Sequence, residues 1–127
     1  MNFKHIIILI VVLAVIGTGI FFITKSKDDL VSESKKDVKK NNLTYDDFVY
    51  KQIASSLREA FSGWGTDEEA VYRNIQKIKN KDDWKMLISV YGIDDKGMNL
   101  VERLINELDS SEISIVNQTL LSFNESI

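Results

Sequence analysis

Residues 6–23 form an uninterrupted apolar run, which constrains this chain more than any other feature of its sequence. None of these 18 residues is charged and 15 are apolar. As a helix rising 1.5 Å per residue, the run would extend about 27 Å, close to the roughly 30 Å of a bilayer's hydrocarbon core. The next residues, Thr24-Lys25-Ser26-Lys27, lack the small-residue pattern at which signal peptides are cleaved. We therefore predict that residues 1–23 are a transmembrane helix with a short N-terminal tail.

Two orientations of this span are open. Lys4 precedes the run, whereas Lys25, Lys27 and further lysines come after it, so a count of basic residues places the C-terminal side in the cytoplasm. A short N-terminal tail with one lysine is also typical of a signal anchor, which exports the C-terminal part of its chain. Because large domains translocate largely regardless of their charge, we expect the soluble part to lie outside the cytoplasm.

Residues 24–43 contain ten charged and four apolar residues in twenty. Such a segment cannot bury enough apolar surface to fold alone. It is predicted to be a charged tether, best interpreted as a solvated spacer.

Residues 44–127 show helical periodicity throughout, with apolar residues recurring at spacings of three and four. Breaks at glycines and polar residues divide the segment into five predicted helices, near 44–61, 67–78, 81–91, 97–108 and 110–121. Four pairs of capping residues precede helices, each pair three residues apart: Thr44 with Asp47, Thr66 with Glu69, Asn80 with Asp83, and Asp109 with Glu112. The fold class is therefore all-α, and we expect the aromatic residues Phe48, Trp84 and Tyr91 in the core.

Composition excludes several functions for the soluble part. The chain has no cysteine and its one histidine is His5, so residues 44–127 cannot form a disulfide, a catalytic triad with histidine, or a multi-histidine metal site. These residues carry nine basic and fifteen acidic side chains, a net charge of −6, which suits cations and argues against a nucleic-acid partner. The paired acids at 82–83 and 94–95 are interpreted as a helix start and a loop. No second domain is available to form a cleft, so we do not expect an enzyme.

The loop between the first two predicted helices reads FSGWGTDEE over residues 61–69. Glycines two positions apart permit backbone angles that other residues resist, and can turn several carbonyl oxygens toward one point. Carbonyl oxygens are hard ligands of the kind that Ca²⁺ binds. The GWGTDE motif resembles the GxGTDE signature of an annexin repeat. The segments LREAFSGWGTDEEAVYRNI, WKMLISVYG, LVERLINEL and SSEISIVNQTL are similar to its successive helices, so the resemblance covers about 84 residues, one whole repeat.

The resemblance implies a calcium site and a membrane contact. The ligands would be the main-chain carbonyls of Phe61, Gly63 and Gly65, completed by the carboxylate of Glu107 near the end of the fourth helix. Trp64, between the two glycines, would touch the lipid interface, where tryptophan is favoured.

The chain also departs from the annexin pattern. Annexins have four or more repeats and no membrane span of their own, whereas single annexin-like repeats occur in bacterial and phage proteins. Two functions are then open. The domain is either a module that binds Ca²⁺ and anionic lipid, or a structural protein of a cell envelope or membrane-containing virion that uses its helices for protein contacts without calcium.

Overall fold

The computed structural model describes residues 27–127, which are helical and contain no strand. This confirms the all-α fold class. The elements are α2 (Lys27–Asp37), the 3₁₀ helix η1 (Lys40–Asn42), α3 (Asp47–Ala60), α4 (Glu68–Ile75), α5 (Lys81–Tyr91), α6 (Leu100–Glu107) and α7 (Ser110–Leu121). Five α-helices thus lie in residues 44–127, at the predicted places.

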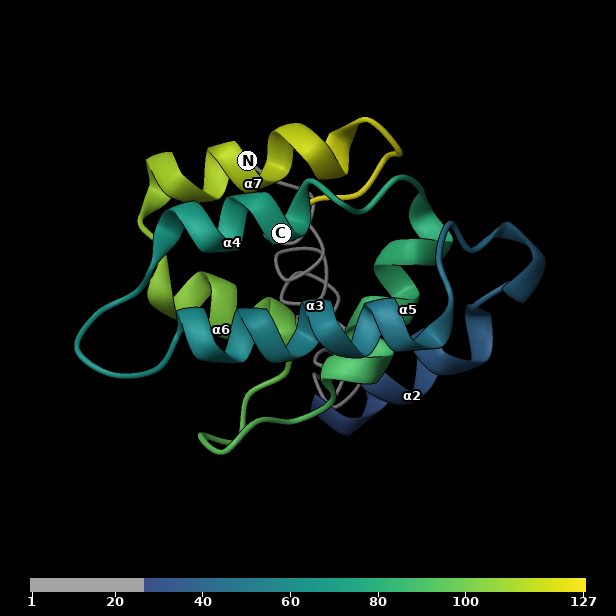
Figure 1. Ribbon diagram of the computed structural model, residues 1–127, viewed down its shortest axis with the longest axis horizontal. Helices are drawn as coiled ribbons and strands as arrows, with labels where there is room; N and C mark the ends of the chain where they lie inside the picture. The colour runs from purple at the N-terminus through teal and green to yellow at the C-terminus, as the bar shows by residue number, and fades with distance from the viewer. Residues whose placement is uncertain (1–26) are drawn as a thin grey trace, which may run out of the picture.

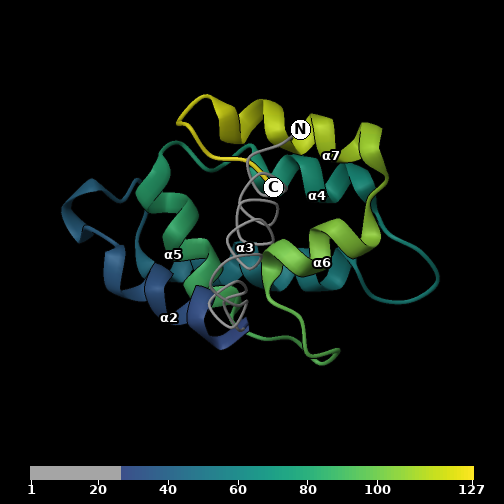
Figure 2. The same ribbon diagram turned by 180° about the vertical axis from the view of Figure 1, so that it is seen from behind.

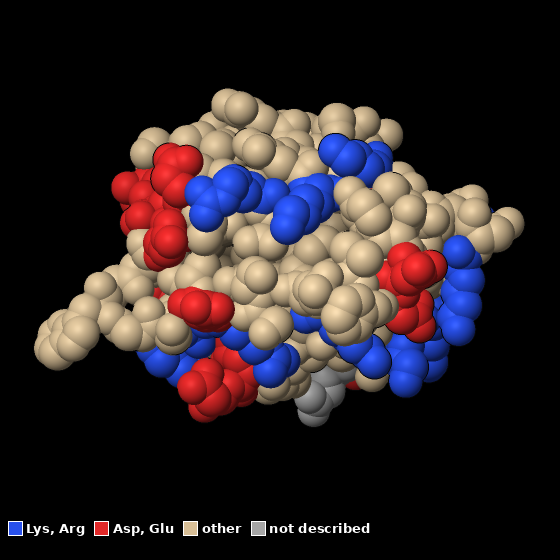
Figure 3. All heavy atoms as spheres, viewed as in Figure 1, with Lys and Arg blue, Asp and Glu red and all other residues tan. Residues whose placement is uncertain are grey.

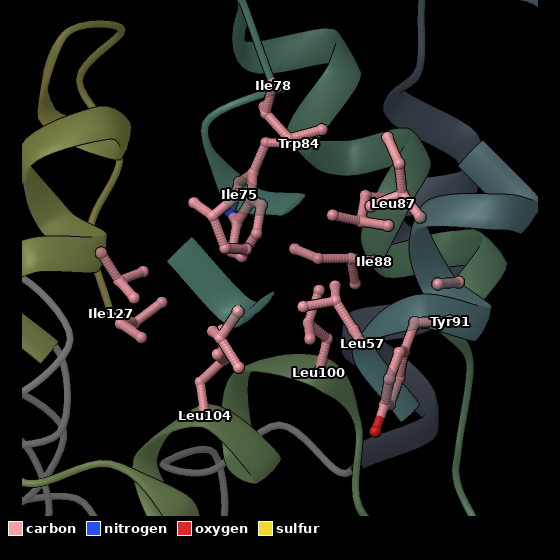
Figure 4. Packing of buried hydrophobic residues seen from close by; sticks show 14 of the residues in the cluster. Leu57, Ile75, Ile78, Trp84, Leu87, Ile88, Tyr91, Leu100, Leu104 and Ile127 are labelled. Atoms are coloured by element: carbon pink, nitrogen blue, oxygen red, sulfur yellow. The ribbon is translucent and has the colours of Figure 1, made fainter. Parts of the chain in front are cut away.

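The apolar stripes of these helices meet in one core. α5 contacts α2, α3 and α6, while α4 contacts α3 on one side and α7 on the other. Figures 1 and 2 both show α4 and α7 side by side along one edge of the bundle. Figure 4 shows buried side chains from α3, α4, α5 and α6 converging around Ile88, with Ile127 at the margin. The predicted stripe of α5 is buried as a whole: Trp84, Leu87, Ile88 and Tyr91.

The starts of α4, α5, α6 and α7 are set by side-chain caps, whereas α3 begins without one. Asn80 accepts a hydrogen bond from the main-chain N–H of Asp83, as predicted for the start of α5. Asp109 and Glu112 form the predicted reciprocal capping box of α7, and a second box joins Asn99 and Glu102 at α6. These caps keep the connections between α5, α6 and α7 in fixed positions.

Residues 27–42 differ from the solvated tether expected from their composition, because they fold onto α5. Leu30 packs against the core and Ser34 is buried. After α2, the carboxylate of Asp82 accepts hydrogen bonds from the main-chain N–H of Lys39 and the side-chain amide of Asn42, each at 3.0 Å. The segment is too polar to fold alone, but α5 supplies a surface and hydrogen-bond acceptors for it. The composition of residues 24–43 gives no sign of these contacts.

The predicted membrane span, residues 6–23, lies outside the described residues. Within 27–127, no helix is long and apolar enough to cross a membrane.

The expectation that Phe48 belongs to the core is wrong, since its side chain is exposed. The buried stripe of α3 runs through Tyr50, Ile53, Ala54 and Leu57. At about 100° per residue, position 48 is some 200° from position 50 and faces the opposite side of the helix.

Candidate functional site

The loop between α3 and α4 is closed at its base and open at its tip. The N–H of Asp67 donates to the carbonyl of Ala60 at 2.9 Å, which brings the two ends of the loop together. Gly63 and Gly65 have φ angles of 81° and 98°, in the left-handed region that favours glycine. Apart from the glycine itself and its two chain neighbours, nothing lies within 4 Å of where a β-carbon would stand at either position. The loop therefore extends into solvent, away from the helices, as Figure 1 shows at the left.

Trp64 lies at the tip of this loop and is 106% exposed relative to the reference for a tryptophan. The other tryptophan, Trp84, is 3% exposed in the core. Figure 3 shows an uncharged projection at the position of the loop, beyond the acidic and basic groups on that face. A large aromatic side chain held this far from its own domain is free to enter another apolar surface.

Glu107 is the last residue of α6 and lies beside the same loop. Its Oε2 accepts a hydrogen bond from the hydroxyl of Thr66 at 2.9 Å. The structure therefore brings together two segments 41 residues apart, the loop and the helix end that contain the four predicted calcium ligands. The hydroxyl of Thr66, expected to cap α4, serves this long-range contact, and the cap of α4 is the side chain of Asp67.

A buried arginine that the sequence reasoning missed occupies the centre of this region. Arg103 on α6 is 3% exposed, and each of its three guanidinium nitrogens donates a hydrogen bond. Nε reaches Oε1 of Glu107 at 2.9 Å, and Nη2 reaches the carbonyl of Phe61 at 3.1 Å. The guanidinium carbon also lies 5.3 Å from the ring centre of Phe61. Two of the four predicted calcium ligands are thus bound to a cationic side chain of the protein itself.

The third partner of Arg103 is Asp94, in the connection between α5 and α6. Its Oδ2 accepts from Nη1 of Arg103 at 3.0 Å and from the hydroxyl of Tyr91 at 2.7 Å. Its Oδ1 accepts from the main-chain N–H groups of Lys96 and Met98 at 2.9 and 3.0 Å. Burial raises the pKa of Asp94, but these hydrogen bonds and the nearby guanidinium outweigh burial and lower it. Asp94 is therefore an ionised, fixed anchor for Arg103.

The signal that could have found Arg103 is the choice of arginine in a lysine-rich chain. The sequence has thirteen lysines and three arginines. A planar fork with five donors suits a site that must bind several oxygens at once, which an ammonium group satisfies poorly. Arg103 also stands four residues before Glu107, the spacing of an ion pair on one helix face.

A cleft of about 310 Å³ lies beside this network, lined by Arg58 of α3, the 61–63 segment, Tyr91 at the end of α5, the 94–96 segment and Arg103. Its lining carries charges of both signs, among them those of Arg58, Lys96 and Asp95. Such a mixture does not define a site for a strongly charged ligand.

As they stand, the oxygens near the loop suit a guanidinium better than a divalent ion. Arg103 places a positive charge against the carboxylate and the carbonyl that Ca²⁺ would need. Within residues 27–127, no group of three or more Asp, Glu, His or Cys side chains is placed to hold a metal ion.

Comparison of the chain with models of protein families, with curated proteins and with solved structures found no match. What this region does is therefore inferred from its own residues.

Proposed function

We propose that this protein is a membrane-anchored, annexin-like docking module that inserts Trp64 into the interface of a lipid bilayer without requiring Ca²⁺. The observation that carries the proposal is the complete exposure of Trp64 at the tip of a loop held by two left-handed glycines. The order of five helices and the position of Glu107 beside the GWGTDE loop support the annexin-like interpretation.

The loop is suited to the region between lipid headgroups and acyl chains. An indole ring has a large apolar body and one N–H donor, and it prefers this region of a membrane. Burying roughly 200 Å² of aromatic surface at about 25 cal/mol per Å² contributes at most about 5 kcal/mol. One tryptophan therefore gives weak binding when the module is free in solution.

Attachment to the membrane makes such weak binding sufficient. α2 begins at Lys27, four positions after the end of the predicted span, and packs directly on α5. If residues 6–23 cross the bilayer, the domain is held at its surface, where the local concentration of lipid is far above that needed by a free module.

The charge of the domain selects the lipid. Asp67, Glu68 and Glu69 come soon after the tip, and residues 44–127 carry a net charge of −6. With no bound cation to bridge like charges, an anionic surface repels this region. We therefore expect docking to zwitterionic lipid and weaker docking as the anionic fraction rises.

The two tryptophans allow a direct test on the full chain reconstituted in phosphatidylcholine vesicles. Bromine atoms on the acyl chains quench only an indole that enters the bilayer, and aqueous acrylamide quenches only an exposed one. A Trp84→Phe variant reports on Trp64 alone, and a Trp64→Ala variant reports on buried Trp84. We expect bromine to quench the first variant and acrylamide to reach it poorly, while the second variant responds little to either quencher.

If acrylamide reaches Trp64 fully and bromolipid does not quench it, the proposal is wrong. If Trp64 is instead shielded from both quenchers, and more so as the protein density in the vesicles rises, the loop docks to protein. That result would favour the alternative of a structural protein of an envelope or virion.

A further inference from the structure

The guanidinium of Arg103 is surrounded by oxygens from three separate segments. Glu107 ends α6, Asp94 lies between α5 and α6, and Phe61 comes directly after α3. The side chain of Arg103 is 4% exposed and that of Asp94 is 2% exposed, so water does not screen their ion pair. No other basic group in the described part of the chain makes two such contacts with carboxylates within 3.0 Å.

These three oxygens are the kind that a hard cation binds. Two belong to carboxylates and one to a main-chain carbonyl, and Ca²⁺ takes ligands of both kinds. The guanidinium instead satisfies them with three separate N–H donors and contributes one positive charge.

We propose that Arg103 replaces a bound cation and so holds the 61–67 loop in place without Ca²⁺. A neutral residue at position 103 then converts the same oxygens into a Ca²⁺ site. The natural chain is then indifferent to calcium, because the position is filled by a group that cannot dissociate. This inference concerns the base of the loop and does not depend on docking of Trp64 to lipid.

The geometry also sets how strong the converted site would be. Asp94 is fixed by two main-chain N–H groups and the Tyr91 hydroxyl, so it keeps its place when Arg103 is changed. Glu107 is then held on one side only, by the hydroxyl of Thr66, and is the last residue of α6. Its carboxylate can therefore move toward the place of the guanidinium. Oxygens arranged around a guanidinium must move closer together to reach the roughly 2.3–2.6 Å of a calcium bond. We therefore expect weak binding, with a Kd on the order of 10⁻⁴–10⁻³ M.

The test is thermal unfolding of the full chain in a nonionic detergent, followed by circular dichroism, with and without several millimolar Ca²⁺ or Mg²⁺. Arg103→Gln removes the charge and keeps a polar side chain of moderate length. Arg58→Gln is the matched control, because Arg58 also binds a carbonyl and lies over a ring, both of Tyr91, but touches no carboxylate. Arg103→Gln with Glu107→Gln removes one of the proposed ligands.

We expect the natural chain and Arg58→Gln to unfold at the same temperature with and without Ca²⁺. Arg103→Gln should unfold at a lower temperature and recover part of the loss with Ca²⁺, but little with Mg²⁺. At ten times the Kd, Ca²⁺ should raise its ratio of folded to unfolded protein about elevenfold. The double variant should lose most of this response.

A rise in the unfolding temperature of the natural chain with Ca²⁺ would overturn the proposal, because the position would then not be filled. The proposal is equally wrong if Arg103→Gln responds to Ca²⁺ no more than Arg58→Gln. It also fails if Arg103→Gln stays unfolded at every Ca²⁺ concentration, since the ion would then be unable to stand in for the guanidinium. The quenching of Trp64 by lipid is measured on chains that keep Arg103, so failure of this proposal and failure of lipid docking are distinguishable.

Discussion

Replacing Asp83 by asparagine tests whether one buried carboxylate fastens the start of the domain to α5. The side chain of Asp83 is fully buried. It accepts hydrogen bonds from the main-chain N–H and the hydroxyl of Thr44 at 2.9 and 2.6 Å, from the N–H of Lys79 at 3.0 Å, and from the hydroxyl of Tyr50. Four donors from three places in the chain thus depend on two carboxylate oxygens.

The expected cost comes from counting acceptors. An asparagine at this position has one carbonyl oxygen, and its NH₂ group faces donors where the second oxygen was. One main-chain N–H that points at this buried side chain then lacks an acceptor, which costs about 1–3 kcal/mol. The remaining bonds lose their ionic partner, which roughly halves their strength. We expect Asp83→Asn to lower the free energy of unfolding by about 3–4 kcal/mol, a large part of the roughly 5–15 kcal/mol typical of a domain.

Urea unfolding of the full chain in detergent, followed by circular dichroism, measures this cost. Asp82→Asn is the matched control, because Asp82 also accepts two hydrogen bonds from residues 39–42 but is only partly buried. We expect this control to lose about 1 kcal/mol or less. Equal losses in the two variants, or a loss below about 1 kcal/mol for Asp83→Asn, would refute the role given to Asp83.

The natural chain and Asp83→Asn should also differ in how their free energy of unfolding depends on pH. Burial raises the pKa of Asp83, but the hydrogen bonds from Thr44, Tyr50 and Lys79 together outweigh it, so the pKa is lowered. Stability from the ionised group is then fully present above the unfolded value of about 3.9, and is lost as pH falls through the lower folded value. The gap between the natural chain and Asp83→Asn should therefore be constant near neutral pH and narrow below about pH 4. A gap that stays constant down to the acid limit of folding would contradict this.

Three further changes have outcomes set by the structure. A chain without residues 1–42 should have a free energy of unfolding in urea about 2–4 kcal/mol lower than a chain without residues 1–26, because it loses the packing of α2 and the hydrogen bonds to Asp82. Equal stability of the two chains would mean that docking of α2 adds nothing. Gly65→Ala should lower the free energy of unfolding by about 1–2 kcal/mol through backbone strain alone, because a β-carbon there meets nothing beyond the adjacent residues. Gly65→Asn should cost less. A loss above about 3 kcal/mol in thermal unfolding would point to a steric clash instead. Asn99→Ala should cost about 1–2 kcal/mol by removing the cap of α6, and an unchanged unfolding temperature would count against that cap.

The helical part of the fold was predictable because its signals are local. Apolar spacing located five helices, and the caps at Asn80 and Asp109 act within three residues of themselves. The loop at 61–67 was predictable for the same reason, since two glycines two positions apart indicate a left-handed turn.

Long-range contacts explain where prediction from the sequence ended. Thr44 and Thr66 have the form of helix caps, yet their hydroxyls donate to Asp83 and Glu107, 39 and 41 residues away. No local pattern distinguishes these two uses of a threonine. The same holds for residues 27–42, whose polar composition is typical of a spacer until the partner surface on α5 is known. The neighbours of Arg103 come from three segments, so only the folded chain brings them together.

The attachment of α2 to α5 also sets how far the domain could travel from the proposed membrane anchor. Among the side chains described for α2, Ser34 is the one that is buried, so this helix should open at a free energy well below that of global unfolding. Once released, the sixteen residues 27–42 behave as a coil with a typical end-to-end distance of about 20–24 Å. If residues 6–23 cross a bilayer, as we propose, undocking α2 would then let the module search a volume tens of ångströms wide around that anchor. The balance between these two states is adjustable by single substitutions on the surface shared by α2 and α5.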